Sequence, residues 1–129
     1  MKIKKLTLSI LPESLGICHL DEKSPVPAWA IGNISFSSIT KTKDELSIVC
    51  PQDKIPAGVL AEKNWRAFKI GGPLDLSLTG IVASLSAPLA KAKISIFYIS
   101  TYQTDYLLVE DKNFKKAKKI LSGFCFLKE

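Results

Sequence analysis

The stretch that decides the fold is Ile94-Ser-Ile-Phe-Tyr-Ile-Ser100, followed by Thr101-Tyr-Gln-Thr-Asp105 and then by Tyr106-Leu-Leu-Val109. Its two outer runs are rich in β-branched and aromatic residues, which favour strands, whereas the middle run is short and polar. This pattern predicts two β-strands joined by a polar tip.

Helical patterns flank these strands on both sides. Ile81, Leu85 and Leu89 fall at helical spacing, so a helix is expected over 81–92. The lysine-rich segment 112–121 has the same apolar spacing, and a second helix is expected there, ended by Gly123. Further strands are expected over 65–70 and 124–127. The resulting order of strand, helix, strand, strand, helix, strand is the ferredoxin-like βαββαβ unit of α+β proteins.

The first half of the chain is less regular. Its prolines leave room for short helical turns only, and the expected elements are strands over 6–11, 14–20, 34–40 and 45–50 and a short helix over 27–31.

An internal repeat links the two halves. The pattern Thr40-x-x-x-Asp44-x-Leu46 recurs 61 residues later as Thr101-x-x-x-Asp105-x-Leu107, each time between two apolar β runs. The repeat predicts a duplicated unit, with a degenerate first copy over 1–62 and a regular second copy over 63–129.

The composition limits the classes of function. The 129 residues carry 18 Lys+Arg against 12 Asp+Glu, and 47% are hydrophobic, which suits a compact chain with a core. No apolar run approaches the roughly 20 residues that a membrane helix needs, and the N-terminal segment is a poor signal peptide. A cytoplasmic protein without a membrane partner is therefore expected.

Arg66 is the only arginine, so no nucleic acid is expected as a partner. The lysines of 112–121 are interpreted as the solvated face of a helix.

Residues that carry chemistry are scarce. Cys18, Cys50 and Cys125 each lie in an apolar run, where a thiol behaves as a small buried hydrophobe. His19 is the only histidine, and the sequence has neither a GxSxG motif nor a P-loop. We therefore expect no metal, no cofactor and no catalytic residue, and thus a protein that is not an enzyme.

On these residues the chain resembles a known family. Gly-Pro-Leu-Asp-Leu-Ser-Leu-Thr-Gly (72–80), Ala-Ser-Leu-Ser-Ala-Pro-Leu-Ala (83–90) and the run 94–109 resemble the ACT domain found in CASTOR-type cytosolic arginine sensors. Pro-Ala-Trp-Ala (27–30) and Thr-Lys-Asp-Glu-Leu-Ser-Ile-Val-Cys-Pro (42–51) resemble the degenerate partner ACT domain of the same proteins. One departure is Lys93, where related sequences usually carry glycine. The resemblance implies ACT domains in tandem.

The resemblance also implies a ligand. It implies that a free amino acid, either arginine or another small amino acid, binds at the interface between two ACT units and has a regulatory effect without catalysis. By the same resemblance, Thr101, Tyr102 and Asp105 match ligand-contacting tip positions. Ser38 and Ile39 match the facing strand of the first unit.

The residues themselves support such a site. A helix that starts near Thr79, Gly80 and Ile81 offers backbone N–H groups and the positive end of its dipole to a carboxylate. Gly80 has no Cβ and lets a ligand approach the backbone closely. Asp105, and Asp75 as a further candidate, offer a carboxylate to the ammonium group or to a basic side chain.

Structural interpretations compete with these roles. Thr79 and Gly80 also fit a helix cap, Asp105 fits a turn residue that bonds its own backbone, and Tyr102 fits core or interface packing. The alternative functions are a structural or protein-interaction module that keeps the fold without a ligand, and a small uncharacterised enzyme. The sheet edges of two such small units favour a homodimer.

Overall fold

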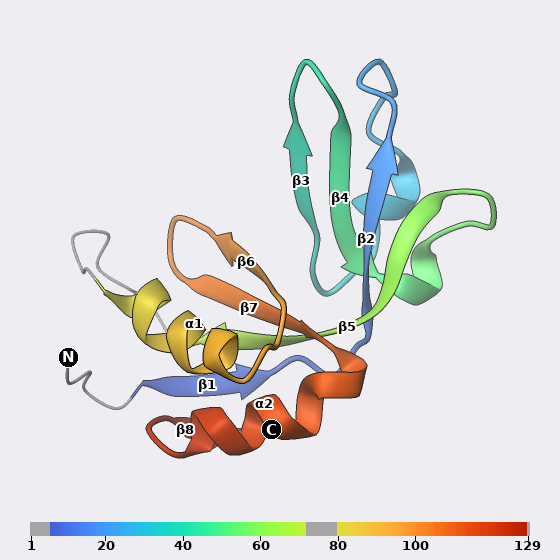
Figure 1. Ribbon diagram of the computed structural model, residues 1–129. Coiled ribbons are helices and arrows are strands. Elements are labelled where there is room, and N and C mark those ends of the chain that lie inside the picture. Colours follow the sequence, from blue (N-terminus) through green and yellow to red (C-terminus); the bar gives the residue numbers. More distant parts are fainter. Residues whose placement is uncertain (1–5, 72–79, 129) are drawn as a thin grey trace. The chain divides into compact units, whose positions relative to one another are not determined.

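The computed structural model describes residues 6–71 and 80–128 and divides the chain into two compact units (Figure 1). The larger unit consists of Met1–Pro12 and Arg66–Glu129, and the smaller unit consists of Glu13–Trp65. The strand β5 (Leu60–Ile70) contributes its first residues to the smaller unit and its last residues to the larger one. No helix of the described residues is long and apolar enough to cross a membrane.

The larger unit has a sheet in the order β6-β7-β5-β1-β8. The expected hairpin is confirmed, since β6 (Ile96–Ser100) and β7 (Asp105–Glu110) pair antiparallel. The strand β1 (Thr7–Ile10) pairs antiparallel with β5 and parallel with β8 (Phe126–Lys128). From β5 to β8 the strands and helices follow the expected βαββαβ order.

Both helices of the larger unit pack on one face of this sheet. They are α1 (Ile81–Lys91) and α2 (Phe114–Ser122), and α2 is preceded by the 3-10 turn η3 (Asp111–Asn113). Their apolar positions lie where the spacing places them, and they join the buried strand residues of one core. The fully buried members of that core are Leu8, Phe68, Ile70, Leu85, Leu89, Leu107, Val109, Ala117 and Leu121.

The strand β1 lies outside the unit in which we expected it. The sequence predicted units over 1–62 and 63–129, whereas residues 1–12 group with residues 66–129. The physical reason is the side chain of Leu8, which is fully buried in the larger unit's core with Phe68 and Ile70. The sequence pattern identified the strand, but a pattern cannot say which sheet a strand joins.

The smaller unit is an antiparallel sheet in the order β3-β4-β2-β5. Its own strands are β2 (Leu15–Leu20), β3 (Ser38–Lys41) and β4 (Leu46–Pro51). Its only helical elements, over the fully described range 13–65, are the 3-10 turns η1 (Ala28–Ala30) and η2 (Gln52–Lys54). The first copy is therefore degenerate in its helices, as expected.

The thiols Cys18 and Cys50 lie in the core of the smaller unit, as their apolar surroundings predicted. Burial raises the pKa of the Cys50 thiol to about 11, because the charged thiolate is poorly solvated there. Cys50 faces Gly16 across β2 and β4, and a Cβ at Gly16 would overlap Cδ1 of Ile55. Cys125 is buried in the other unit. These three thiols behave as core residues.

Candidate functional site

The tip of the β6–β7 hairpin is closed by two threonines. The N–H of Thr101 donates to the carbonyl of Thr104 at 2.7 Å, and the N–H of Thr104 donates to Oγ1 of Thr101 at 3.2 Å. Thr104 is buried, and its hydroxyl donates to the carbonyl of Ile70 at the end of β5. These bonds fix the tip against the central strand of the larger unit.

Asp105 follows directly and is held by a tyrosine. The hydroxyl of Tyr98 donates to Oδ2 of Asp105 at 2.7 Å, and both side chains are half-buried. The register aligns Tyr98 with Leu107 and Ser100 with Asp105, so the tyrosine and the aspartate are diagonal neighbours on the face that the helices cover. Burial, and then the hydrogen bond to Asp105, raise the pKa of Tyr98 above its ordinary value. The phenol therefore stays a donor and orients the carboxylate.

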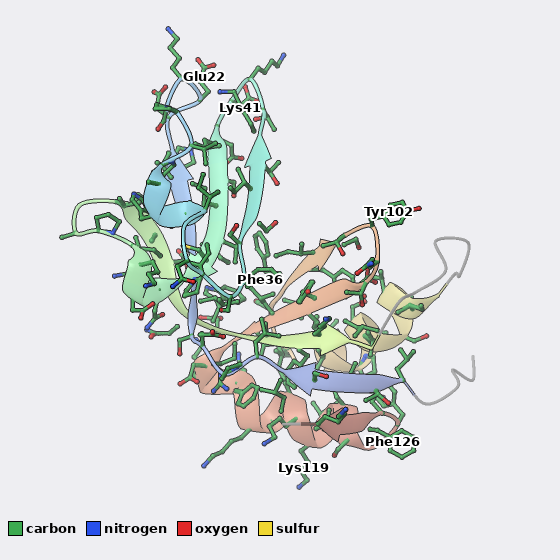
Figure 2. The ribbon with its side chains drawn as sticks, turned by 180° about the vertical axis from the view of Figure 1, so that it is seen from behind. Glu22, Phe36, Lys41, Tyr102, Lys119 and Phe126 are labelled. Atoms are coloured by element: carbon green, nitrogen blue, oxygen red, sulfur yellow. The ribbon has the colours of Figure 1, made fainter. Side chains whose placement is uncertain are left out.

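The start of α1 lies at the same end of the larger unit as this hairpin tip (Figures 1 and 2). Gly80 has a φ of 82°, and its carbonyl accepts the N–H of Ser84 at 2.9 Å, which closes the first turn. The N–H groups of residues 81–83 precede the first intrahelical bond and point out of the helix end. Of the described residues, none caps this end with a side chain. The helix start can accept an anionic group.

The other expected residues differ in their exposure and in the unit to which they belong. Tyr102 is 85% exposed and projects away from the tip (Figure 2). Thr101 is exposed, and Ile81 is half-buried and packs against the core of the larger unit. Ser38 and Ile39 lie in β3 of the smaller unit, aligned with Val49 and Ile48. Asp75 and Thr79 lie outside the described residues.

The tips of the two hairpins correspond at an offset of 59 residues instead of the expected 61. The tip of the β3–β4 hairpin is closed by Thr42, whose N–H donates to the carbonyl of Glu45 at 3.0 Å, as that of Thr101 does to Thr104. The strand ends agree, because Lys41 aligns with Leu46 as Ser100 does with Asp105. The expected match of Asp44 with Asp105 is therefore wrong.

This register changes which residue of the smaller unit corresponds to Asp105. The counterpart of Asp105 in the smaller unit is Leu46, which is fully buried and apolar. Asp44 lies within the exposed tip instead. Of these two hairpins, only the β6–β7 hairpin carries a carboxylate at the first position of its second strand.

Tyr98 contacts the candidate residue Asp105, but sequence reasoning did not single it out. It lies inside an apolar run, and this composition favoured a role in the core. The register of the hairpin could have identified Tyr98. Tyr98 lies two residues before the end of β6 and is therefore diagonal to Asp105, the first residue of β7.

Comparison with known proteins agrees with this fold. A family model described as ACT domain matches residues 60–123, from the start of β5 to the end of α2. The chain belongs to the ACT domain family. A second family model, described as an N-terminal domain, matches residues 13–58. The boundary between the two matches falls just before β5, the strand that contributes residues to both units.

A curated relative of this ACT protein is the human cytosolic arginine sensor for mTORC1 subunit 1. It is 35% identical over 106 residues, which is 76% of this chain and 31% of the relative. The chain therefore spans about a third of the length of the curated relatives that it matches.

Solved structures resemble nearly the whole ACT chain. A crystal structure of an Agrobacterium tumefaciens protein is 40% identical, with a TM-score of 0.89 over 98% of this chain and 96% of that one. The regulatory subunit of aspartate kinase from Thermus thermophilus has a TM-score of 0.61 over 91% of this chain and 95% of that one. At 11% identity, this second likeness shows the fold alone.

Proposed function

We propose that this chain is a non-catalytic regulatory protein that binds a free amino acid. The observation that carries the proposal is the oriented carboxylate of Asp105, bonded to Tyr98 at the end of the larger unit where α1 begins. An amino acid has one anionic and one cationic group, and the helix start and Asp105 offer complements to both. The names of the curated relatives, which are arginine sensors, support the same function.

In this proposal each residue has a separate role. The N–H groups at Gly80 and Ile81 receive the ligand carboxylate, and Asp105 receives the ammonium group or a basic side chain. Tyr98 orients Asp105, and Thr101 and Tyr102 border the ligand at the tip. The proposal also keeps as ligand contacts the candidates Ser38, Ile39, Asp75 and Thr79.

Arginine is the first ligand to test, because the curated relatives are named as arginine sensors. Their name also supports a cytosolic place of action. We further propose a homodimer, since β3, β6 and β8 each have one described neighbour and leave a strand edge for pairing.

The test is a thermal-shift screen of the full chain against the twenty amino acids. A ligand present at 100 times its Kd stabilises the folded state by about 2.7 kcal/mol, which raises the Tm by several degrees. Calorimetric titration of the stabilising amino acid then gives the Kd. The absence of any shift would favour the interaction module without a ligand.

Mass spectrometry of the ligand separates binding from catalysis. A regulatory protein returns the amino acid unchanged after long incubation with equimolar protein. Its conversion into a product would contradict the non-catalytic role and favour the small enzyme.

A further inference from the structure

The charge of this protein is concentrated in one of its units. The larger unit holds 13 of the 18 basic residues and 5 of the 12 acidic ones, a formal charge of +8. The smaller unit holds 5 basic and 7 acidic residues, a formal charge of −2. Such an asymmetry is an electrostatic property that acts on binding partners.

Four lysines of the larger unit form a continuous stripe. Lys112 in η3 and Lys115, Lys116 and Lys119 in α2 follow the spacing i, i+3, i+4, i+7, which places them on one side of the helix. All four side chains are exposed, while Ala117 and Leu121 face the core. We call these four residues the lysine stripe. Lys119 extends outward from α2 in Figure 2.

The stripe has few counter-charges of its own. Lys112 Nζ lies 3.9 Å from Oε2 of Glu110, and Lys116 Nζ donates to the carbonyl of Ala92 at 3.4 Å. Within the described part of the chain, Lys115 and Lys119 have no ion pair. Like charges at i, i+4 repel each other and destabilise a helix. The carboxylates of an anionic partner would offset this repulsion between the lysines.

The surroundings of the stripe separate the classes of anionic partner. Arg66 is the only arginine, and it stacks on Phe114 at 4.2 Å with its NH1 atom 3.8 Å from Asp111. It is therefore held in internal contacts, and the stripe offers no guanidinium for bidentate phosphate recognition. Within α2, the aromatic ring of Phe114 lies against Phe68 and is not a platform for base stacking.

A lipid surface also fits poorly. The large apolar side chains that are exposed in the described chain are Val26, Ile31, Leu60, Val82, Tyr102 and Phe126, and none of them lies in α2. Interfacial helices insert apolar side chains next to their basic residues, whereas α2 turns its apolar side into the core.

We propose that the lysine stripe is a docking surface for an acidic segment of a partner protein. Carboxylates spaced along one face of a helix or an extended segment match four ammonium groups at intervals of one helical turn. The surface is formed by η3 and α2, whereas the amino-acid site is formed by the hairpin tip and α1. The inference does not depend on the proposed ligand.

The experiment uses the full chain and a fluorescein-labelled helical peptide with glutamates at i, i+3, i+4 and i+7. Fluorescence anisotropy at about 20 mM NaCl should show saturable binding, weakened severalfold at about 200 mM NaCl because salt screens the charges. The double variant Lys115→Gln/Lys119→Gln should bind about tenfold more weakly. The matched control Lys43→Gln/Lys54→Gln removes two exposed lysines from the smaller unit and should bind within about twofold of the parent.

Two further probes decide between the partner classes. A DNA duplex and vesicles that contain phosphatidylserine should bind more weakly than the peptide. Tighter binding of either probe, equal effects of the two double variants, or no binding of the peptide at low salt would overturn the proposal. Circular dichroism of each variant shows that its fold is unchanged.

Discussion

The phenol oxygen of Tyr98 lies 2.7 Å from Oδ2 of Asp105, across a hairpin in which these two residues are diagonal neighbours. One carboxylate oxygen is thus occupied by a fixed donor, and the rotation of the carboxylate is restricted. An oriented carboxylate binds a cationic group with a smaller loss of conformational entropy than a freely rotating one.

Removal of this donor should weaken the hairpin. The variant Tyr98→Phe loses a hydrogen bond to a half-buried carboxylate, and we expect a loss of about 1–2 kcal/mol in unfolding free energy by urea denaturation. Tyr102→Phe is the control, because Tyr102 is 85% exposed and its hydroxyl should contribute little. Equal stabilities of the two variants would contradict a structural role for the bond.

Neutralisation of the site carboxylate should weaken ligand binding. Asp105→Asn keeps an oxygen that accepts from Tyr98 but removes the charge, and we expect about 10- to 100-fold weaker binding of the stabilising amino acid by calorimetry. Asp44→Asn is the matched control, since Asp44 lies in the exposed tip of the other hairpin. If both variants bind as the parent does, the site lies elsewhere.

A Cβ at Gly80 should strain the entry into α1. The φ of 82° is left-handed, and a residue other than glycine, asparagine or aspartate pays about 1–2 kcal/mol there. Gly80→Ala should therefore lose stability in urea, whereas Gly80→Asn should lose less. Gly80→Val should in addition lose amino-acid binding, because its branched side chain crowds the N–H groups. An alanine variant as stable as the asparagine one would argue against the backbone strain.

The packing around Gly16 should show coupling between two positions. Gly16→Ala places a methyl group against Cδ1 of Ile55, and we expect a loss of about 1–3 kcal/mol from overpacking. Ile55→Val removes that Cδ1 and costs about 0.5–1.5 kcal/mol alone. The double variant should be more stable than the sum of the single losses predicts, and strict additivity would rule out the contact as the cause.

Alkaline pH should destabilise the smaller unit. The pKa of Cys50 is raised from 9.0 to about 11 in the folded chain, so the unfolded chain releases the thiol proton first as pH rises. The stabilisation from the protonated thiol is complete below pH 9 and decreases between pH 9 and about 11. Urea midpoints across this range should fall less in Cys50→Ala than in the parent. An equal fall in both would assign the effect to other groups, among them Tyr98.

The sequence predicted those elements whose conformation follows from local spacing and propensity. The helix over 81–92 and the hairpin around 101–105 were predicted because their apolar spacing and β propensity agree with the packing that they meet. The strand β1 was placed in the unit over 1–62, because the pattern of its residues does not show in which of two cores Leu8 is buried.

The site was predicted in part. Asp105 and Gly80 were singled out from the chemistry of their side chain and backbone, and Asp105 also from the family resemblance, and both stay candidates. The hydroxyl of Tyr98 was not singled out, because it lies in an apolar run. The repeat at 61 residues misled because a shift of two residues preserves the face on which each side chain lies, so the alternating pattern fits either register.

The strand β5 contributes residues to both units, and this affects the entropic cost of closing the larger unit's sheet. Leu15 aligns with Trp65, so the folded smaller unit brings its own two ends together. The residues that flank the smaller unit in the sequence belong to the larger unit. Among them, the N–H of Leu11 donates to the carbonyl of Ala67 at 3.0 Å. An unfolded segment between them would have to be closed as a long loop at an entropic cost, whereas a folded one acts as a preformed turn. A folded smaller unit therefore lowers the entropic cost of bringing β1 to β5.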